Sequence, residues 1–208
     1  MVRIFPLIFI LLWSSAFITT KPIIDNSDPF SALAFRFFFV AIGFYLFSFY
    51  SKQTIFVEKK KLFESLLSGV LFHGFYLGGV FYSISIGMPT GITALIVTLQ
   101  PVLTNILAGP LLNEKITKPQ WIGMILGFTG ASLVLGFDIG KNLPLNGVLA
   151  AFISLFAITF STIWQKKLSN NLPLSSSNMY QAIGGCLFHI LVIIFKLFGI
   201  SSAVAQNI

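Results

Sequence analysis

The chain has 208 residues, of which 56% are hydrophobic and 9% are charged, with 13 Lys and Arg against 6 Asp and Glu. Soluble domains carry about 25% charged residues, so this composition excludes an ordinary soluble domain. The single cysteine, Cys186, cannot form an internal disulfide, which argues against a secreted disulfide scaffold. The formal net charge of +7 fits basic loops beside a lipid bilayer better than it fits nucleic-acid binding. No nucleic-acid partner is therefore expected.

Long apolar runs dominate the chain, and about 20 apolar residues cross a bilayer as a helix. Seven segments qualify. In chain order they are Ile4–Ile24, Phe30–Tyr50, Leu62–Gly87, Thr90–Leu112, Gln120–Phe137, Leu145–Trp164 and Ser176–Phe198. Short connections that contain Pro, Gly, Asn or Asp separate several of them. The predicted fold class is therefore an all-α integral membrane protein with about seven transmembrane helices.

Basic residues predict how these helices are oriented, because Lys and Arg concentrate in cytoplasmic loops. If the N-terminus is cytoplasmic, nine basic residues lie inside: Arg3, Lys52, Lys59, Lys60, Lys61, Lys115, Lys118, Lys166 and Lys167. Three lie outside: Lys21, Lys141 and Lys196. We therefore expect a multi-pass protein of the cell (inner) membrane, the plasma membrane, with its N-terminus in the cytoplasm.

A weak internal repeat relates the two ends of the chain. Asn26-Ser27-Asp28-Pro29 and Asn170-Asn171-Leu172-Pro173 lie 144 positions apart, and Ser31 corresponds to Ser175. The sixth and seventh segments thus correspond to the first and second. Because the repeating unit contains an odd number of helices, its second copy must enter the membrane inverted, a plan that recurs in secondary transporters. Two complete units would need about 280 residues, so we expect the second unit to be truncated.

Several short motifs, in this order and spacing, resemble the drug/metabolite transporter superfamily and its ten-helix EamA-type members. They are Trp13-Ser14-Ser15-Ala16-Phe17, Ala34-Phe35-Arg36-Phe37, Phe81-Tyr82-Ser83-Ile84, Gln100-Pro101-Val102-Leu103-Thr104 and Asn113-Glu114-Lys115-Ile116-Thr117. The resemblance implies a first five-helix EamA-like repeat over residues 1–137. It also implies a partial second repeat of two helices over residues 145–208. Asn113 departs from the family, in which a Gly commonly precedes the Glu.

The resemblance implies a secondary transporter that moves small metabolites by alternating access, most simply by exporting amino acids or related compounds. It implies neither an enzyme nor a cofactor. A second copy or another chain would complete the second repeat. The alternative is a truncated fragment, or a scaffold subunit of a membrane complex, that transports nothing. A membrane enzyme is a third interpretation, with His73 and Arg36 as its only catalytic candidates.

Arg36 is the remaining basic residue, and it lies inside the second predicted span. It lies about 9 Å from the outer end of the second helix at 1.5 Å per residue. A charge at that depth is costly and marks a functional candidate. One interpretation is that Arg36 binds a substrate carboxylate or pairs with Asp25 or Asp28 to close an outer gate. The other is that its long side chain reaches the outer surface. The family carries an Arg at the matching position.

His73 lies in the middle of the third segment, near Tyr76. A histidine there is a candidate for proton coupling, although a lone histidine also commonly forms a hydrogen bond between helices. Neither His73 nor His189 has Cys or Glu partners at metal-ligand spacing, so no metal site is expected. Tyr76 and Trp13 are candidates for the substrate path, or they fill the interior.

The fourth segment has a polar middle. Gln100, Thr104 and Asn105 share one broad helical face, and Gln100 and Asn105 are further candidates for the substrate path. Pro101 and Pro110 each remove a helical hydrogen bond, so kinks are expected at both. This face lines a cavity, or it belongs to a bent packing helix whose amides are satisfied.

Overall fold

The computed structural model describes residues 4–112, 117–135, 143–169 and 172–205 of the chain. Every regular element in these ranges is helical, which confirms the predicted all-α fold class. The elements are α1 (Phe5–Asn26), α2 (Pro29–Tyr50), α3 (Lys59–Gly69), η1 (Val70–Leu77), α4 (Gly78–Ser85), α5 (Thr90–Thr98), α6 (Gln100–Leu112), α7 (Lys118–Leu135), α8 (Leu145–Ser169) and α9 (Leu174–Ala205).

These elements form seven helical rods at the predicted positions. Helices α3, η1 and α4 follow one another without a gap, and η1 is a π-helical stretch within this third rod. Helices α5 and α6 make up the fourth rod, which is interrupted at Leu99. The largest difference from the predicted boundaries is α9, which begins two residues earlier and extends seven residues further.

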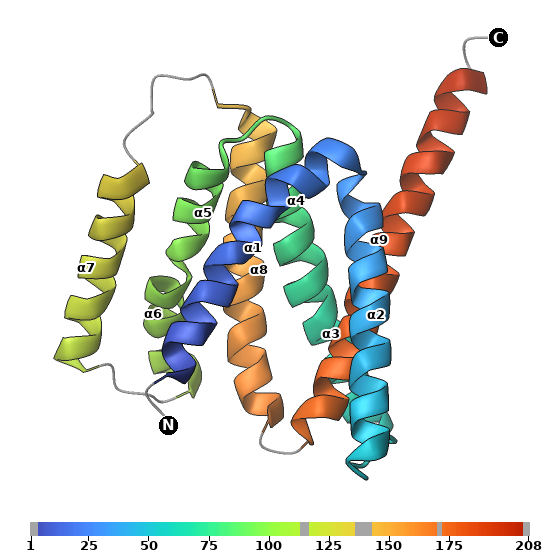
Figure 1. Cartoon of the computed structure of the whole chain (residues 1–208), viewed down its shortest axis with the longest axis horizontal. Helices are drawn as coiled ribbons and strands as arrows, with labels where there is room; N and C mark the ends of the chain where they lie inside the picture. The colour runs from blue at the N-terminus through green and yellow to red at the C-terminus, as the bar shows by residue number, and fades with distance from the viewer. Residues whose placement is uncertain (1–3, 113–116, 136–142, 170–171, 206–208) are drawn as a thin grey trace.

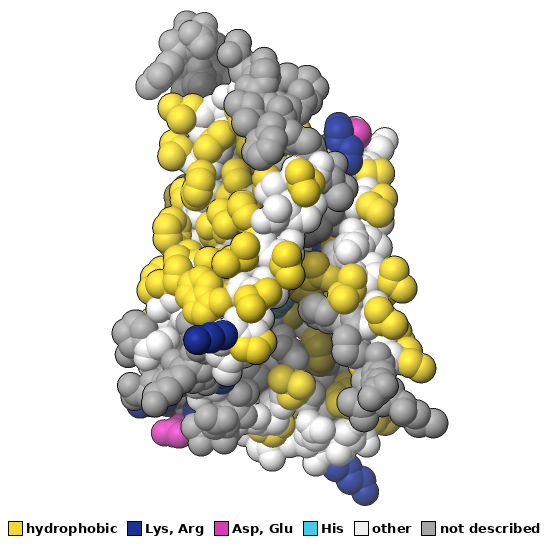
Figure 2. Space-filling view, turned by 90° about the vertical axis from the view of Figure 1, so that its left-hand side faces the viewer, with side chains coloured by type: hydrophobic (Ala, Val, Ile, Leu, Met, Phe, Trp, Pro, Cys, Tyr) yellow, Lys and Arg dark blue, Asp and Glu magenta, His cyan; other side chains and the backbone are white. Residues whose placement is uncertain are grey.

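Within the described residues, five rods are long and apolar enough to cross a membrane: Pro29–Tyr50, Lys59–Ser85, Thr90–Leu107, Leu145–Leu168 and Leu174–Gly199. Helices α1 and α7 are not among these five. Large apolar side chains nevertheless cover the outside of the bundle, Leu11 and Ile18 on α1 and Leu126 on α7 among them. Figure 2 shows hydrophobic side chains over the middle of one face and charged side chains toward its upper and lower ends.

The rods run roughly side by side (Figure 1). Helices α2 and α9 pack together on one flank, α7 lies at the opposite edge, and α1 crosses the front of the bundle obliquely. The chain ascends along α1 and descends along α2, whereas it descends along α8 and ascends along α9. The two helix pairs that the sequence repeat relates therefore run in opposite senses.

Small polar residues fill much of the interior, where they let helix backbones approach closely and bond across interfaces. Ser161 Oγ donates to the carbonyl of Ser68 at 3.1 Å and so joins α8 to α3. Ser83 Oγ donates to the carbonyl of Gly147 at 2.9 Å and joins α4 to α8. The long rod Lys59–Ser85 is thereby joined to α8 at two positions 15 residues apart, Ser68 and Ser83.

Candidate functional site

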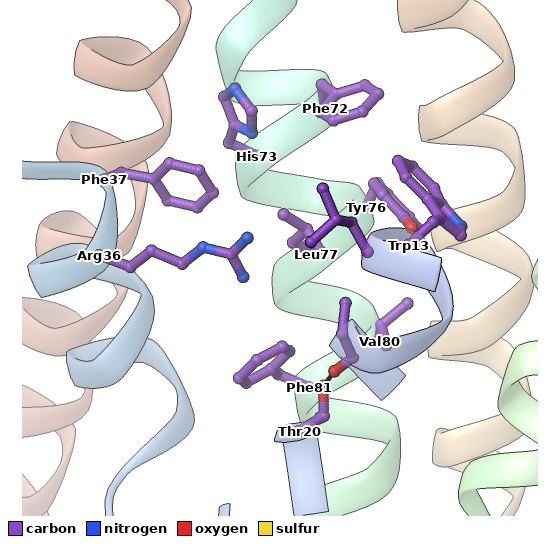
Figure 3. A pocket seen from close by; sticks show the side chains of 12 residues that line it. Trp13, Thr20, Arg36, Phe37, Phe72, His73, Tyr76, Leu77, Val80 and Phe81 are labelled. Atoms are coloured by element: carbon purple, nitrogen blue, oxygen red, sulfur yellow. Dashed lines mark hydrogen bonds between the residues drawn. The ribbon is translucent and has the colours of Figure 1, made fainter. Parts of the chain in front are cut away.

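A cavity of about 240 Å³ lies between α1, α2 and the η1–α4 part of the third rod. Four of the candidates from the sequence line it: Trp13 on α1, Arg36 on α2, and His73 and Tyr76 on η1. Figure 3 shows Arg36 extending from α2 into this space, with Tyr76 and Trp13 on the far side. Residues that are 23 to 63 positions apart in the sequence thus meet around one space.

The Arg36 side chain is exposed and is not sealed in the packed core. Its Cζ lies 5.7 Å from the centre of the Phe37 ring, a cation–π arrangement. Within the described part of the chain, no carboxylate lies within ion-pair distance of Arg36. Asp25 and Asp28, considered above as gate partners, pair with Lys21 and Lys196 instead. The guanidinium therefore faces the cavity without an acidic partner from these residues.

Aromatic rings form much of the cavity wall. Phe72 meets Tyr76 edge to face with ring centres 5.4 Å apart, and Phe37 lies 4.3 Å from the His73 ring. Phe72 and Tyr76 are four residues apart in η1, so their side chains lie on the same face of this helix. The Tyr76 side chain is 3% exposed, so its position is set by packing. The cavity is thus an apolar, aromatic space with one cationic group.

The π-helix η1 places His73 against the α9 helix. A π-helix shifts the register of backbone hydrogen bonds, and single π turns occur frequently at functional sites. The N–H of Gly78, at the end of η1, donates to the carbonyls of Gly74 and Phe75. The carbonyl of His73 lies 3.0 Å from Nε2 of His189, a fully buried side chain of α9. His189 therefore contacts the cavity-lining segment from behind without lining the cavity itself.

An ion pair joins α9 to the first turn of α2, near one end of the bundle. Lys196 Nζ lies 2.6 Å from Asp28 Oδ1, while Asp28 Oδ2 accepts from the Ser31 N–H at 2.9 Å and so caps α2. Partial burial raises the pKa of Asp28, but the Lys196 ammonium and the Ser31 N–H and hydroxyl lower it by more. The pKa of this carboxyl therefore lies below its usual range.

Gln100 and Asn105 do not line this cavity. Gln100 Nε2 donates to Thr104 Oγ1 at 3.2 Å and to Thr162 Oγ1 at 3.4 Å, so it bridges α6 and α8. Asn105 Nδ2 lies 2.8 Å from Met124 Sδ, in a second cavity of about 360 Å³ between the fourth rod and α7. The polar face of the fourth rod thus contacts α8 through Gln100 and the cavity beside α7 through Asn105.

The fourth rod is interrupted next to Pro101, and the predicted kinks at Pro101 and Pro110 stay predictions. Helix α5 ends at Thr98 and α6 begins at Gln100, and the N–H of Leu99 donates to the carbonyl of Ile96, three residues back. Pro101 itself has no N–H to continue the helical pattern. Pro110 lies in α6, and its side chain is outside the described part of the structure.

Several cavity residues were not singled out in the sequence, namely Phe37, Phe72, Phe81 and Thr20. Helical spacing from the chosen candidates would have found part of this set: Phe72 is four residues before Tyr76, and Thr20 is seven after Trp13. Among the described residues, no three His, Cys, Asp or Glu side chains are grouped as metal ligands.

A comparison with known protein families agrees with the helical fold and with the order of the sequence motifs. The EamA-like transporter family matches residues 3–136, which is more than half of the chain. The chain belongs to the EamA-like transporter family. This assignment confirms the expected resemblance and favours a transporter over the membrane-enzyme interpretation, because the family is one of transporters.

Curated relatives carry transporter names. The chain is 32% identical over 106 residues to the uncharacterized transporter YvbV of Bacillus subtilis, covering 51% of this chain and 33% of that protein. It is 23% identical over 172 residues to a probable amino-acid metabolite efflux pump of Salmonella typhimurium, covering 80% of this chain and 54% of that protein. A pump of the same name in Escherichia coli is 23% identical over 170 residues, 79% of this chain and 53% of the pump. The chain spans about a third to a half of the length of these relatives.

Proposed function

We propose that this EamA-like protein is a secondary transporter that exports small metabolites, amino acids or related compounds, by alternating access. The observation that carries the proposal is the cavity between α1, α2 and η1, into which Arg36 extends without an acidic partner among the described residues. An ionised side chain at that depth in a span is costly and marks a substrate path. The relatives named as amino-acid metabolite efflux pumps supply the substrate class.

Two features of the bundle support the alternating-access part of the proposal. Helices α1 and α2 run in senses opposite to those of α8 and α9, as an inverted repeat requires. Helices α2 and α9, the second members of the two pairs, pack along each other. Substrate sites of such transporters lie near the interface of the repeats. The described lining of the cavity comes from the first unit alone, and one of its walls is α2, the helix that packs along α9. In this proposal the first repeat comprises residues 1–137 and the partial second repeat comprises residues 145–208.

A flux assay tests the transport proposal. The purified chain, reconstituted in proteoliposomes, is expected to move radiolabelled amino acids or the corresponding organic acids down a gradient. Arg36→Gln is expected to reduce the rate by about tenfold or more, because the only charged group of the described cavity lining is lost. Lys118→Gln removes a charge at the exposed start of α7 and serves as the matched control. If no solute shows protein-dependent flux, the result would favour the non-transporting alternative.

Orientation is tested by labelling single cysteines. With Cys186 replaced by Ala, we introduce Lys21→Cys at the proposed outer end or Lys60→Cys at the proposed inner end. A membrane-impermeant maleimide applied to intact cells is expected to label the first variant and not the second, because basic loops stay in the cytoplasm. The reverse pattern would contradict a cytoplasmic N-terminus.

A further inference from the structure

The described lining of the cavity carries a positive charge and no negative one. Arg36 carries the only side chain of Lys, Arg, Asp or Glu among the described residues that line it. Trp13, Phe37, Phe72 and Tyr76 supply aromatic wall, and the remaining residues are mostly aliphatic. A solute that fills this space therefore meets one cationic group, a few neutral polar groups such as the Tyr76 hydroxyl, and otherwise an apolar surface.

Asp25 and Asp28, the acidic residues considered as partners of Arg36, are already paired. Asp25 pairs with Lys21 one helical turn away, and Asp28 pairs with Lys196 while it caps α2. Neither therefore neutralises Arg36 in this arrangement. An anionic group of the solute would do so, and a carboxylate fits best because a guanidinium presents two parallel N–H donors to its two oxygens.

The same arrangement is unfavourable for an ammonium group. An ammonium would need a carboxylate or several acceptors in the wall, and the described lining offers no carboxylate. It would also be repelled by the guanidinium. Aromatic faces of the wall could attract a cation, but the face of Phe37 already lies 5.7 Å from the Arg36 Cζ.

We propose that the cavity selects organic monoanions with an apolar or aromatic body over zwitterionic amino acids of the same skeleton. This inference rests on the proposed function and narrows its substrate class. The size agrees: a cavity of about 240 Å³ lies just below the range of about 300–1,000 Å³ typical of small-molecule sites, so it suits a small monocarboxylate.

Equilibrium binding to the protein in lipid nanodiscs tests the inference separately from flux. Trp121→Phe and Trp164→Phe leave Trp13, in the cavity wall, as the only tryptophan of the three. Its fluorescence is then titrated with 3-phenylpropanoate, with phenylalanine, which adds the ammonium, and with 3-phenylpropanamide, which removes the charge. Calorimetric titration of the chain with all three tryptophans repeats the series in case the replacements disturb folding.

We expect 3-phenylpropanoate to bind at least about tenfold more tightly than phenylalanine or the amide. Arg36→Gln is expected to abolish the preference for the acid and to leave amide binding within about twofold, whereas Arg36→Lys keeps part of the preference. Lys118→Gln is the matched control and should leave all three affinities unchanged. Unaltered thermal unfolding and amide binding show that the Arg36 variants remain folded.

The outcomes separate this inference from the proposed function. Phenylalanine that binds as tightly as the acid, an acid preference that survives Arg36→Gln, or no binding of any of the three solutes would overturn the inference. If phenylalanine binds better and is also transported in proteoliposomes, the inference fails while the transport proposal stands. If the acid binds as expected but no labelled solute moves, the transport proposal fails while the charge selection stands.

Discussion

His189 Nε2 on α9 lies 3.0 Å from the carbonyl oxygen of His73 on η1. This contact joins residues 116 positions apart and connects the C-terminal helix to the segment that carries the cavity wall. The His189 side chain is fully buried and lies against Gly78, where an added Cβ would approach its Cε1 to 3.1 Å. The absence of a side chain at Gly78 is what gives the imidazole room to reach the backbone of η1.

Replacing His189 by Leu should leave the partly buried His73 carbonyl without this donor. We expect a loss of about 1 kcal/mol in the free energy of unfolding, toward the low end for buried groups because membrane helices find other partners. Thermal unfolding in detergent measures this as a lower Tm. His189→Gln keeps an N–H donor and should lose less. Equal stability of the Leu variant and the unmodified chain would show that the contact contributes nothing.

Glycines set the distance between α3 and α9. A Cβ at Gly69 would collide with the Gln181 backbone, and a Cβ at Gly184 would collide with the Leu66 backbone. Since backbone atoms cannot move aside cheaply, Gly69→Ala and Gly184→Ala should each destabilise the protein by about 1–3 kcal/mol. Gly43 on α2 has nothing described within 4 Å, so Gly43→Ala should be neutral or stabilising by up to about 1 kcal/mol. Comparable Tm losses at all three positions would refute this explanation.

The Asp28–Lys196 ion pair should make stability depend on pH. Because the pKa of Asp28 is lowered in the folded protein, its contribution is present above the usual aspartate pKa of about 4 and is lost as the pH falls through the folded pKa. Asp28→Asn retains a residue suited to capping α2 but removes the charge. We expect its Tm to fall less steeply than that of the unmodified chain below about pH 4.

A double-mutant cycle separates the pair from the cap. The coupling between Asp28→Asn and Lys196→Gln at neutral pH should be about 0.5 kcal/mol, since both side chains are substantially exposed. Asp28→Ala, which also removes the cap, should lose about 1 kcal/mol more. Parallel pH profiles for the unmodified chain and Asp28→Asn would count against the ion pair as the cause.

Tyr76 and Gln100 should differ in their effect on solute binding, although both were candidates for the substrate path. Tyr76 lines the cavity, so Tyr76→Phe removes a hydroxyl beside the solute and should weaken binding by up to about tenfold. Gln100 bonds to Thr104 and Thr162 outside this cavity, so Gln100→Leu should leave the affinity unchanged and lower only the Tm. Titration of both variants with 3-phenylpropanoate tests this. A weaker affinity for the Gln100 variant alone would place the solute near the fourth rod.

The number, order and approximate bounds of the helices followed from the sequence. A continuous apolar run of about 20 residues has few alternatives to a helix in a bilayer, because every backbone N–H and C=O must be satisfied within the segment. The start of α2 was predicted to within one residue, at Phe30, and the structure shows that Asp28 caps the helix and Pro29 takes its first position. The π-helix η1 was not predicted, because apolar composition does not distinguish π from α register.

The candidate site, too, was predictable from the sequence only in part. Arg36 stands out in the sequence because one charge in an apolar span is costly whatever surrounds it. Which residues share its cavity depends on how the helices rotate and pack, and this is decided by contacts such as Ser68–Ser161 and Gly184 against Leu66. In the packed bundle Trp13, His73 and Tyr76 line the same cavity as Arg36, whereas Gln100 and Asn105 lie elsewhere. Hydrophobicity along the chain determined that the protein lies in a membrane as helices, whereas close packing of distant small residues decided which side chains meet.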